Sequence, residues 1–386
     1  MSAGRCFRVL PLLLAVVFAA GVFCPPGWAS EEGKPELTAG EMLALARQTG
    51  WQMCGLIVER LEPRPGSDFP GIAAWLKSYR ELTKGIDSQQ PPEKWPPLEI
   101  GELATHNPAF WRAYYEIAPG DPGLMGLHAG LLLSSGECSR ALYVLVIAWQ
   151  LTDVPKEVRE SLDILAAHAQ RMLVKGRAPL AEGIKLFDAG DREGAVQKYR
   201  QQLAIWPQDG WALYELGLTR FQLQELAAGR KPPALGSIRY GENGPAPTSE
   251  VLRLYAEARE HDPFQYSAYQ GSDPDTVRRA LAMFNECRLE WNKLAKSEGL
   301  LDRQVIERFS VGCQDAGVDE LALVARQVVV ARRGRYSPTD RDLISTSLRR
   351  LAPGLETEAT IKRLAKPGEL KLKQLVKPAA PEAPKP

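Results

Sequence analysis

Residues 179–228 read PLAEGIKLFDAGDREGAVQKYRQQLAIWPQDGWALYELGLTRFQLQELAA, and the spacing of small and aromatic residues in this stretch points to one architecture. Gly183 and Ala195 stand twelve positions apart, and Tyr199 follows four positions later. Pro207 comes twelve positions after Ala195. Two antiparallel helices can approach closely where small residues face each other, a ring fills the space beside them, and proline ends the second helix. Because one such hairpin cannot bury its own apolar face, the pattern predicts an all-helical stack.

The same spacing returns along the chain. Gly217 stands 34 positions after Gly183, and Ala129 and Ala141 are again twelve apart. Residues 251–263 repeat the second half of the pattern. This 34-residue period resembles that of the tetratricopeptide repeat family.

The resemblance implies an all-α fold, in which antiparallel helix hairpins stack as a short tetratricopeptide-like α-solenoid with extra flanking helices. The repeat region is expected at 107–265, with a loop inserted at 228–248 between the two helices of one hairpin. Further helical regions are expected at 30–106 and 266–366.

Caps and breakers place several further helices. Thr38 and Glu41 form a capping-box pattern that opens a helix, and a second helix begins at Ser337-Pro338-Thr-Asp340. Val328–Val330 could form a buried strand. The basic pair and glycine that follow at 332–334 favour a helix C-terminus instead.

The N-terminus has the features of a signal peptide. Arg5 and Arg8 precede an apolar run at 9–23, and small residues at 27–29 offer a cleavage point. We therefore expect a signal peptide at 1–29 and an exported chain, either periplasmic or extracellular. The apolar run is too short for a convincing membrane span, so no integral span is expected after signal removal.

Charge restricts the class of partner. The chain has 48 basic and 47 acidic side chains, and loss of residues 1–30 leaves 46 basic and 47 acidic. This near balance argues against nucleic acid as a partner. Residues 367–386 are rich in proline, alanine and lysine, which predicts a disordered tail. That tail either contacts the anionic envelope weakly or only keeps the domain soluble.

Four cysteines remain after signal removal, at positions 54, 138, 287 and 313. In an oxidising compartment they permit two disulfides in three connectivities. A bridge between Cys287 and Cys313 is favoured, because their helices are expected to be consecutive. Buried thiols in helix interfaces are the alternative.

Catalytic chemistry has no signature in this sequence. The histidines at 106, 128, 168 and 261 include no pair spaced i, i+4, and no CxxC, phosphate-binding glycine loop or G-x-S-x-G occurs. We therefore predict no catalytic residue, no metal site and no cofactor. His128 lies in an apolar helix, where a packed histidine is the expected interpretation.

One enzyme class is kept as an alternative. Residues 318–327 resemble the helix that precedes the catalytic glutamate in lytic transglycosylases, which are exported cell-wall glycan hydrolases with helical superhelices. The Glu-Ser pair of that family is missing here, because the helix continues into Val328–Val330 and Ser297-Glu298 lies upstream in the reverse order.

The favoured function is a non-enzymatic protein–protein interaction module or scaffold. The tetratricopeptide resemblance implies that the first helix of each hairpin lines a groove for a partner peptide or helix. Two alternatives stay open. The aromatic stripe of Trp211, Tyr214, Leu218 and Phe221 could be core, or the protein could be a self-associating structural component of an envelope assembly. The groove residues that the resemblance implies are Arg177, Ile184, Asp188, Trp211, Tyr214, Leu218, Phe221 and Gln222.

Overall fold

The computed structural model describes residues 37–61, 70–84, 104, 106–117, 120–152, 154–231, 247–264 and 287–353. Within these ranges the regular structure is helical, without strands, as expected. The predicted signal peptide, most of the inserted loop 228–248 and the tail 367–386 lie outside them. The helices are α2 (Ala39–Leu61), α3 (Pro70–Thr83), α4 (Pro108–Ile117), α5 (Pro122–Ser135), α6 (Cys138–Ala148), α7 (Lys156–Lys175), α8 (Ala178–Asp188), α9 (Arg192–Ile205), α10 (Gly210–Ala227), α11 (Ser249–His261), α13 (Arg288–Ala295), α14 (Arg303–Asp315), α15 (Asp319–Arg333) and α16 (Pro338–Leu351).

The predicted caps form. Thr38 and Glu41 exchange backbone and side-chain hydrogen bonds at the start of α2, and Ser337 and Asp340 do the same at the start of α16. Val328–Val330 belong to α15, which ends at Gly334 in a left-handed conformation. The sequence interpretation of that segment as helix is therefore confirmed.

Three helix hairpins share one turn. Gly136, Gly190 and Gly317 follow α5, α8 and α14, with φ of 91°, 90° and 76°. The amide of the residue after each glycine donates to the carbonyl five residues earlier, over 2.8, 2.9 and 2.8 Å. Glycine adopts positive φ without the Cβ clash of other residues, so the chain can reverse tightly at these points.

The predicted contact between small and aromatic residues occurs in the α8–α9 hairpin and again in the α10–α11 hairpin. A Cβ added to Gly183 would stand 2.5 Å from the Tyr199 ring, and one added to Gly217 would stand 2.8 Å from the Tyr255 ring. The absence of a side chain at each glycine therefore leaves room for the ring of the opposing tyrosine.

The α14–α15 hairpin was missed by the sequence analysis, which ended the resemblance at residue 265. Ser310, Gly317 and Ala322 keep the spacing of positions 183, 190 and 195. The Ser310 hydroxyl donates to the Ala322 carbonyl over 2.9 Å at the helix contact. A serine that satisfies its own polar group can thus take the place of the small apolar residue.

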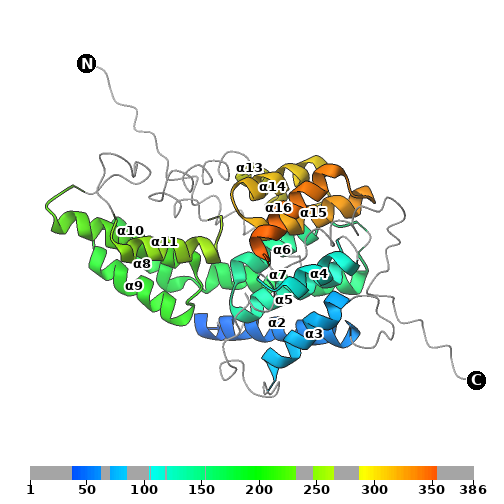
Figure 1. Cartoon of the computed structure of the whole chain (residues 1–386). Helices are drawn as coiled ribbons and strands as arrows, with labels where there is room; N and C mark the ends of the chain where they lie inside the picture. Colours follow the sequence, from blue (N-terminus) through cyan, green and yellow to red (C-terminus); the bar gives the residue numbers. More distant parts are fainter. Residues whose placement is uncertain are drawn as a thin grey trace, which may run out of the picture.

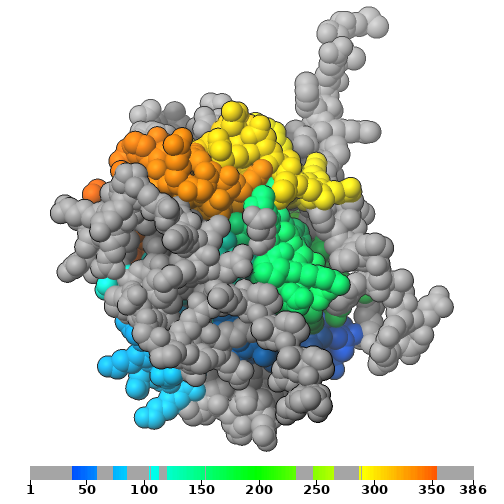
Figure 2. Space-filling view, turned by 90° about the vertical axis from the view of Figure 1, so that its right-hand side faces the viewer, coloured from blue at the N-terminus to red at the C-terminus, as the bar shows by residue number. Residues whose placement is uncertain are grey.

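The helices divide between two hydrophobic cores. The larger core joins α2–α7 with α13–α16, and the smaller joins α8–α11. Figure 1 shows α8–α11 as a block at one side, with α13–α16 above α5 and α6 and with α2 and α3 below. Figure 2 shows the same order from the side, with the yellow and orange C-terminal helices above the blue N-terminal ones.

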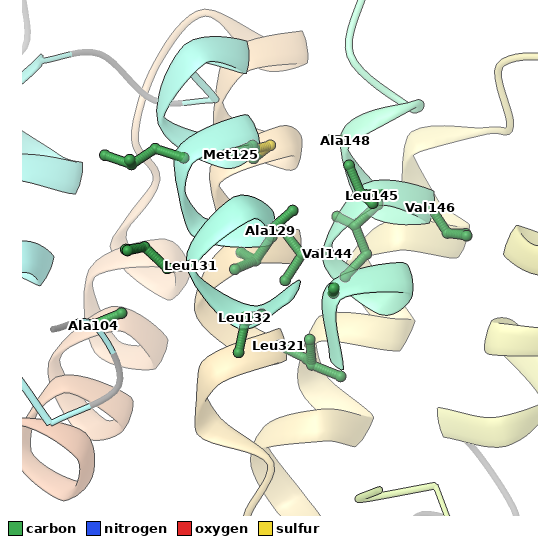
Figure 3. Close-up of a cluster of buried hydrophobic side chains, with 14 of the residues drawn as sticks. Ala104, Met125, Ala129, Leu131, Leu132, Val144, Leu145, Val146, Ala148 and Leu321 are labelled. Carbon is green, nitrogen blue, oxygen red and sulfur yellow. The ribbon is translucent and has the colours of Figure 1, made fainter. Parts of the chain in front are cut away.

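Within the larger core, α6 packs against both α5 and α15. Figure 3 shows Ala129 and Leu132 of α5 beside the helix that carries Val144 and Leu145, with Leu321 of α15 completing the cluster. All five side chains are fully buried.

Among the described helices, none is both long and apolar enough to cross a membrane.

Candidate functional site

Half of the predicted groove residues are inside the smaller core. Tyr214, Leu218, Phe221 and Gln222 of α10 are buried, and the Tyr214 ring stacks on Tyr255 with centroids 5.8 Å apart. The Gln222 carbonyl oxygen accepts a hydrogen bond of 2.8 Å from Arg192. Tyr214, Leu218 and Phe221 of the stripe therefore pack as core in this structure, the alternative that the sequence left open, whereas Trp211 is only half-buried.

The other four predicted residues are at least partly exposed. Arg177 directly precedes α8, Ile184 and Asp188 lie on α8, and Trp211 lies at the start of α10. Helices α8 and α10 contact each other. Asp188 is exposed, while Arg177, Ile184 and Trp211 are half-buried. Ile184 and Asp188 are four positions apart, so they share one face of α8.

Arg177 is held as a structural clamp. Its guanidinium donates to the Asp209 carboxylate over 2.8 Å and lies 5.4 Å from the Trp211 ring centre and 5.1 Å from that of Trp206. Gln202 donates to the other oxygen of Asp209 over 3.1 Å. This arrangement fixes the start of α10 against the end of α9.

Glu215 joins the surface residues and was not predicted. The Trp211 indole Nε1 donates to Glu215 Oε1 over 2.9 Å. Burial raises the pKa of Glu215 to about 7, the Trp211 hydrogen bond opposes that rise, and the charge of Asp188 adds to it. Position 215 is one turn after Trp211, so the i, i+4 spacing was the available signal.

Tyr199 of α9 approaches the same carboxyl groups from inside. The side chain is fully buried, and burial followed by the charges of Glu215 and Asp188 raises its pKa. The hydroxyl lies beside Thr219 but completes no hydrogen bond of normal geometry among the described residues. We call Tyr199, Trp211, Glu215 and Asp188 the acidic site.

Three other buried carboxylates are paired with cations. Glu320 pairs with Arg140 at 2.7 Å, Asp209 with Arg177 at 2.8 Å and Asp340 with Arg326 at 3.0 Å. Within the described ranges, neither carboxyl group of the acidic site forms an ion pair. The buried Asp262 resembles Glu215 in this respect, because its described hydrogen-bond donors are the uncharged Tyr143 hydroxyl and the Phe264 amide.

The segment that resembles a transglycosylase helix is a core helix. Residues 319–330 of α15 are buried. Burial alone would raise the pKa of Glu320, but the charge of Arg140 and hydrogen bonds with Arg140 and His128 lower it to about 2. A carboxyl group with that pKa is ionised at neutral pH and has no proton to donate. His128 is fully buried, 2.8 Å from Glu320, which agrees with its interpretation as a packed histidine.

A polar seam joins the two cores where α11 ends against α6. His261 Nδ1 lies 2.7 Å from Glu137 Oε1, and the Tyr143 hydroxyl donates to Asp262 over 2.6 Å. The Trp206 indole donates to the Gly136 carbonyl over 2.8 Å. These bonds connect the α8–α11 block to the turn between α5 and α6.

The two cysteines of the predicted disulfide, Cys287 and Cys313, lie in contact in the structure but are not bonded to each other. Cys287 and Cys313 are fully buried with sulfurs 3.2 Å apart, which is contact and not a bond. Cys54 and Cys138 are also buried and free. The bridge itself therefore stays a prediction.

Within the part of the chain that the structure describes, no three His, Cys, Asp or Glu side chains are grouped as a metal ion would require. The chain matches no family model, no curated protein and no solved structure. The residues described above therefore carry the functional inference.

Proposed function

We propose that this protein is an exported, non-enzymatic binding module or scaffold, and that the surface formed by α8 and the start of α10 holds a peptide or helix of a partner protein. The observation that carries the proposal is the set of Ile184, Asp188 and Trp211, which reach the surface on adjoining helices. A half-buried tryptophan beside an aliphatic and an acidic side chain is typical of a binding anchor with a polar rim.

We also propose that the hairpins α5–α6, α8–α9 and α10–α11 are tetratricopeptide-like units of a short solenoid. Support comes from the 34-residue separation of Gly183 and Gly217, each against a tyrosine, and from the common turn at Gly136 and Gly190. In such units the first helices line the groove, which here are α8 and α10 for the last two hairpins.

Charge reversal on the exposed rim tests the binding function without disturbing the core. Asp188 lies at the last position of α8, where arginine complements the helix dipole, so Asp188→Arg should fold normally. The matched control is Asp315→Arg, an exposed reversal at the last position of α14. Both variants and the unchanged protein are used to capture partners from the native envelope, with oligomeric state measured in parallel.

We expect Asp188→Arg to lose one discrete partner that Asp315→Arg retains. Identical captures would contradict the α8–α10 surface as the binding face. A change in oligomeric state of Asp188→Arg alone would support self-association instead.

A further inference from the structure

Aromatic rings from four segments hold the end of α11 against the larger core. Phe264 follows the end of α11, and its ring stacks on Trp291 of α13 with centroids 5.2 Å apart and on Phe309 of α14 at 6.0 Å. The Tyr143 ring of α6 lies nearly perpendicular to Phe264, at 4.6 Å. We call Tyr143, Phe264, Trp291 and Phe309 the aromatic box. Because Phe264 comes directly after the α8–α11 block, the box is one of the places where that block is joined to the larger core.

One wall of the box is a short helix. The eight residues of α13 make about two turns, and isolated helices of that length are not stable in water. Among the described helices, α13 packs most closely against α14 and less extensively against α6. Trp291 therefore depends on the contact between α13 and α14 for its place in the box.

A pair of thiols lies at that contact, one helical turn from the box on each helix. Cys287 directly precedes α13, four positions before Trp291, and Cys313 lies on α14, four positions after Phe309. Both cysteine side chains are fully buried, and their sulfurs are 3.2 Å apart. A bond between these sulfurs would fasten the start of α13 to α14.

Gly312 allows the two cysteines to meet. A Cβ added at this position would stand 2.8 Å from Cβ and 2.9 Å from Cα of Cys287, closer than such atoms approach in proteins. The Cys287 backbone is part of the chain entering α13 and cannot turn aside as the end of a flexible side chain can. Any larger residue at position 312 would therefore push Cys287 away from Cys313.

We propose that Cys287 and Cys313 are a disulfide site that locks the aromatic box, and that Gly312 is the residue that positions the pair. One cysteine thiolate attacks glutathione disulfide and releases one glutathione, and the second thiolate then displaces the other glutathione from the mixed disulfide. The net reaction joins the two sulfurs and reduces one glutathione disulfide to two glutathione molecules. Since the bonded residues are 26 positions apart, the bond should favour the closed arrangement on the order of a hundredfold.

The test compares the oxidised and reduced forms of the purified protein by hydrogen exchange and mass spectrometry at one pH. Because α13 is too short to stay helical when it detaches, amide exchange in residues 288–295 measures its detachment. We expect this exchange to be at least tenfold slower in the oxidised form, and exchange in residues 258–264 to be slower as well. Exchange in residues 180–205 of α8 and α9 should be the same in both forms.

Two variants separate the proposed bond from other effects of the oxidant. Cys313→Ala removes one partner, so we expect the same exchange in residues 288–295 with and without oxidant. Cys138→Ala removes a buried thiol outside the pair and should keep the difference. Failure of the unchanged protein to form the bridge would overturn the disulfide site. A bridge that forms without slowing exchange in residues 288–295 would overturn the lock.

The rate of bridge formation tests the role of Gly312. We expect Gly312→Ala to form the bridge at least tenfold more slowly than the unchanged protein, while Gly40→Ala, whose Cβ would meet nothing within 4 Å, keeps the rate. Circular dichroism of the reduced variants checks their helicity, and a loss of helicity confined to Gly312→Ala would also support the close contact with Cys287. An unchanged rate in a folded Gly312→Ala would overturn the positioning role.

Discussion

A Cβ atom added to Gly183 would stand 2.5 Å from Cε1 of Tyr199, closer than such atoms approach in proteins. The two residues come from the facing helices α8 and α9, so this contact sets how closely the hairpin closes. Because the ring is fully buried, it cannot move into solvent to relieve a clash.

We therefore expect Gly183→Ala to lower the free energy of unfolding by about 1–3 kcal/mol, as overpacking typically does. The control is Gly55→Ala in the interior of α2, where a Cβ would meet nothing within 4 Å. That substitution should raise stability by up to about 1 kcal/mol, because alanine favours helix over glycine. Urea unfolding of both variants checks the two signs, and a neutral Gly183→Ala would contradict the proposed close contact.

The ion pair between Arg140 and Glu320 connects α6 to α15. Glu320→Gln should destabilise the protein by about 3 kcal/mol, because it removes the nearest carboxylate from the buried Arg140 guanidinium, which keeps only the longer 3.5 Å contact with Glu137. Arg350 and Asp319 form a half-exposed pair at 3.3 Å, so Arg350→Gln should change stability by about 1 kcal/mol or less. Thermal unfolding of the two variants measures the contrast. Equal losses of stability in the two variants would contradict the larger contribution that we assign to the buried pair.

The two cysteines in contact predict one bridge in an oxidising compartment. Folding in the presence of glutathione disulfide should join Cys287 to Cys313 and release two molecules of glutathione, while Cys54 and Cys138 stay as thiols. Burial raises the pKa of Cys138 and of Cys313 alike, so it is the contact between the Cys287 and Cys313 sulfurs that selects this bridge. Peptide mapping by mass spectrometry after alkylation identifies the pairs. A bridge that includes Cys54 would contradict the described packing.

The polar seam predicts a pH dependence of stability. Burial alone would lower the pKa of His261, but the hydrogen bond and charge of Glu137 raise it, with Glu260 adding to the rise and Arg140 opposing it. A histidine with a raised pKa contributes stability that is fully present below its unfolded pKa of about 6.5 and is lost as pH rises through the folded pKa. Glu137→Gln should therefore reduce stability more at about pH 6 than at about pH 8.5.

Asp262 in the same seam also lowers the stability of the protein as pH rises, because burial raises its pKa and its ionisation disfavours the folded state. Urea unfolding of the unchanged protein and of Glu137→Gln at the two pH values gives the comparison. The exposed substitution Glu157→Gln is the control and should show no such difference. A loss that is larger at the higher pH would contradict the role of the His261 contact.

Much of the helical framework could be predicted because its signals are local. The Thr38 and Glu41 cap, the turn at Gly190 and the small residues that face Tyr199 all act within a few positions or one hairpin. The α14–α15 hairpin was not predicted, because the pattern expects a small apolar residue at position 310 and serine is polar. The hydroxyl of Ser310 finds its acceptor, the Ala322 carbonyl, only in the folded protein.

The candidate site was less readable from sequence. The aromatic stripe on α10 has the same periodicity whether it packs as core or lines a groove, so only burial assigns Phe221 to the interior. Glu215 was missed because its significance depends on desolvation and on Asp188, which is 27 positions away in the chain. The ion pair between Arg140 and Glu320 could not be predicted either, because the two residues are 180 positions apart and no local pattern connects them.

Crosslinking from the α8–α10 surface is the most direct test of the proposed binding function. A photoreactive phenylalanine analogue is placed at half-buried position Ile184 on α8, or at exposed position Gln201 on α9 as the control, and the cells that produce the protein are illuminated. We expect position 184 to give one discrete adduct with another protein and position 201 to give none. Equal crosslinking from both positions, or adducts from position 201 alone, would contradict binding at the α8–α10 surface.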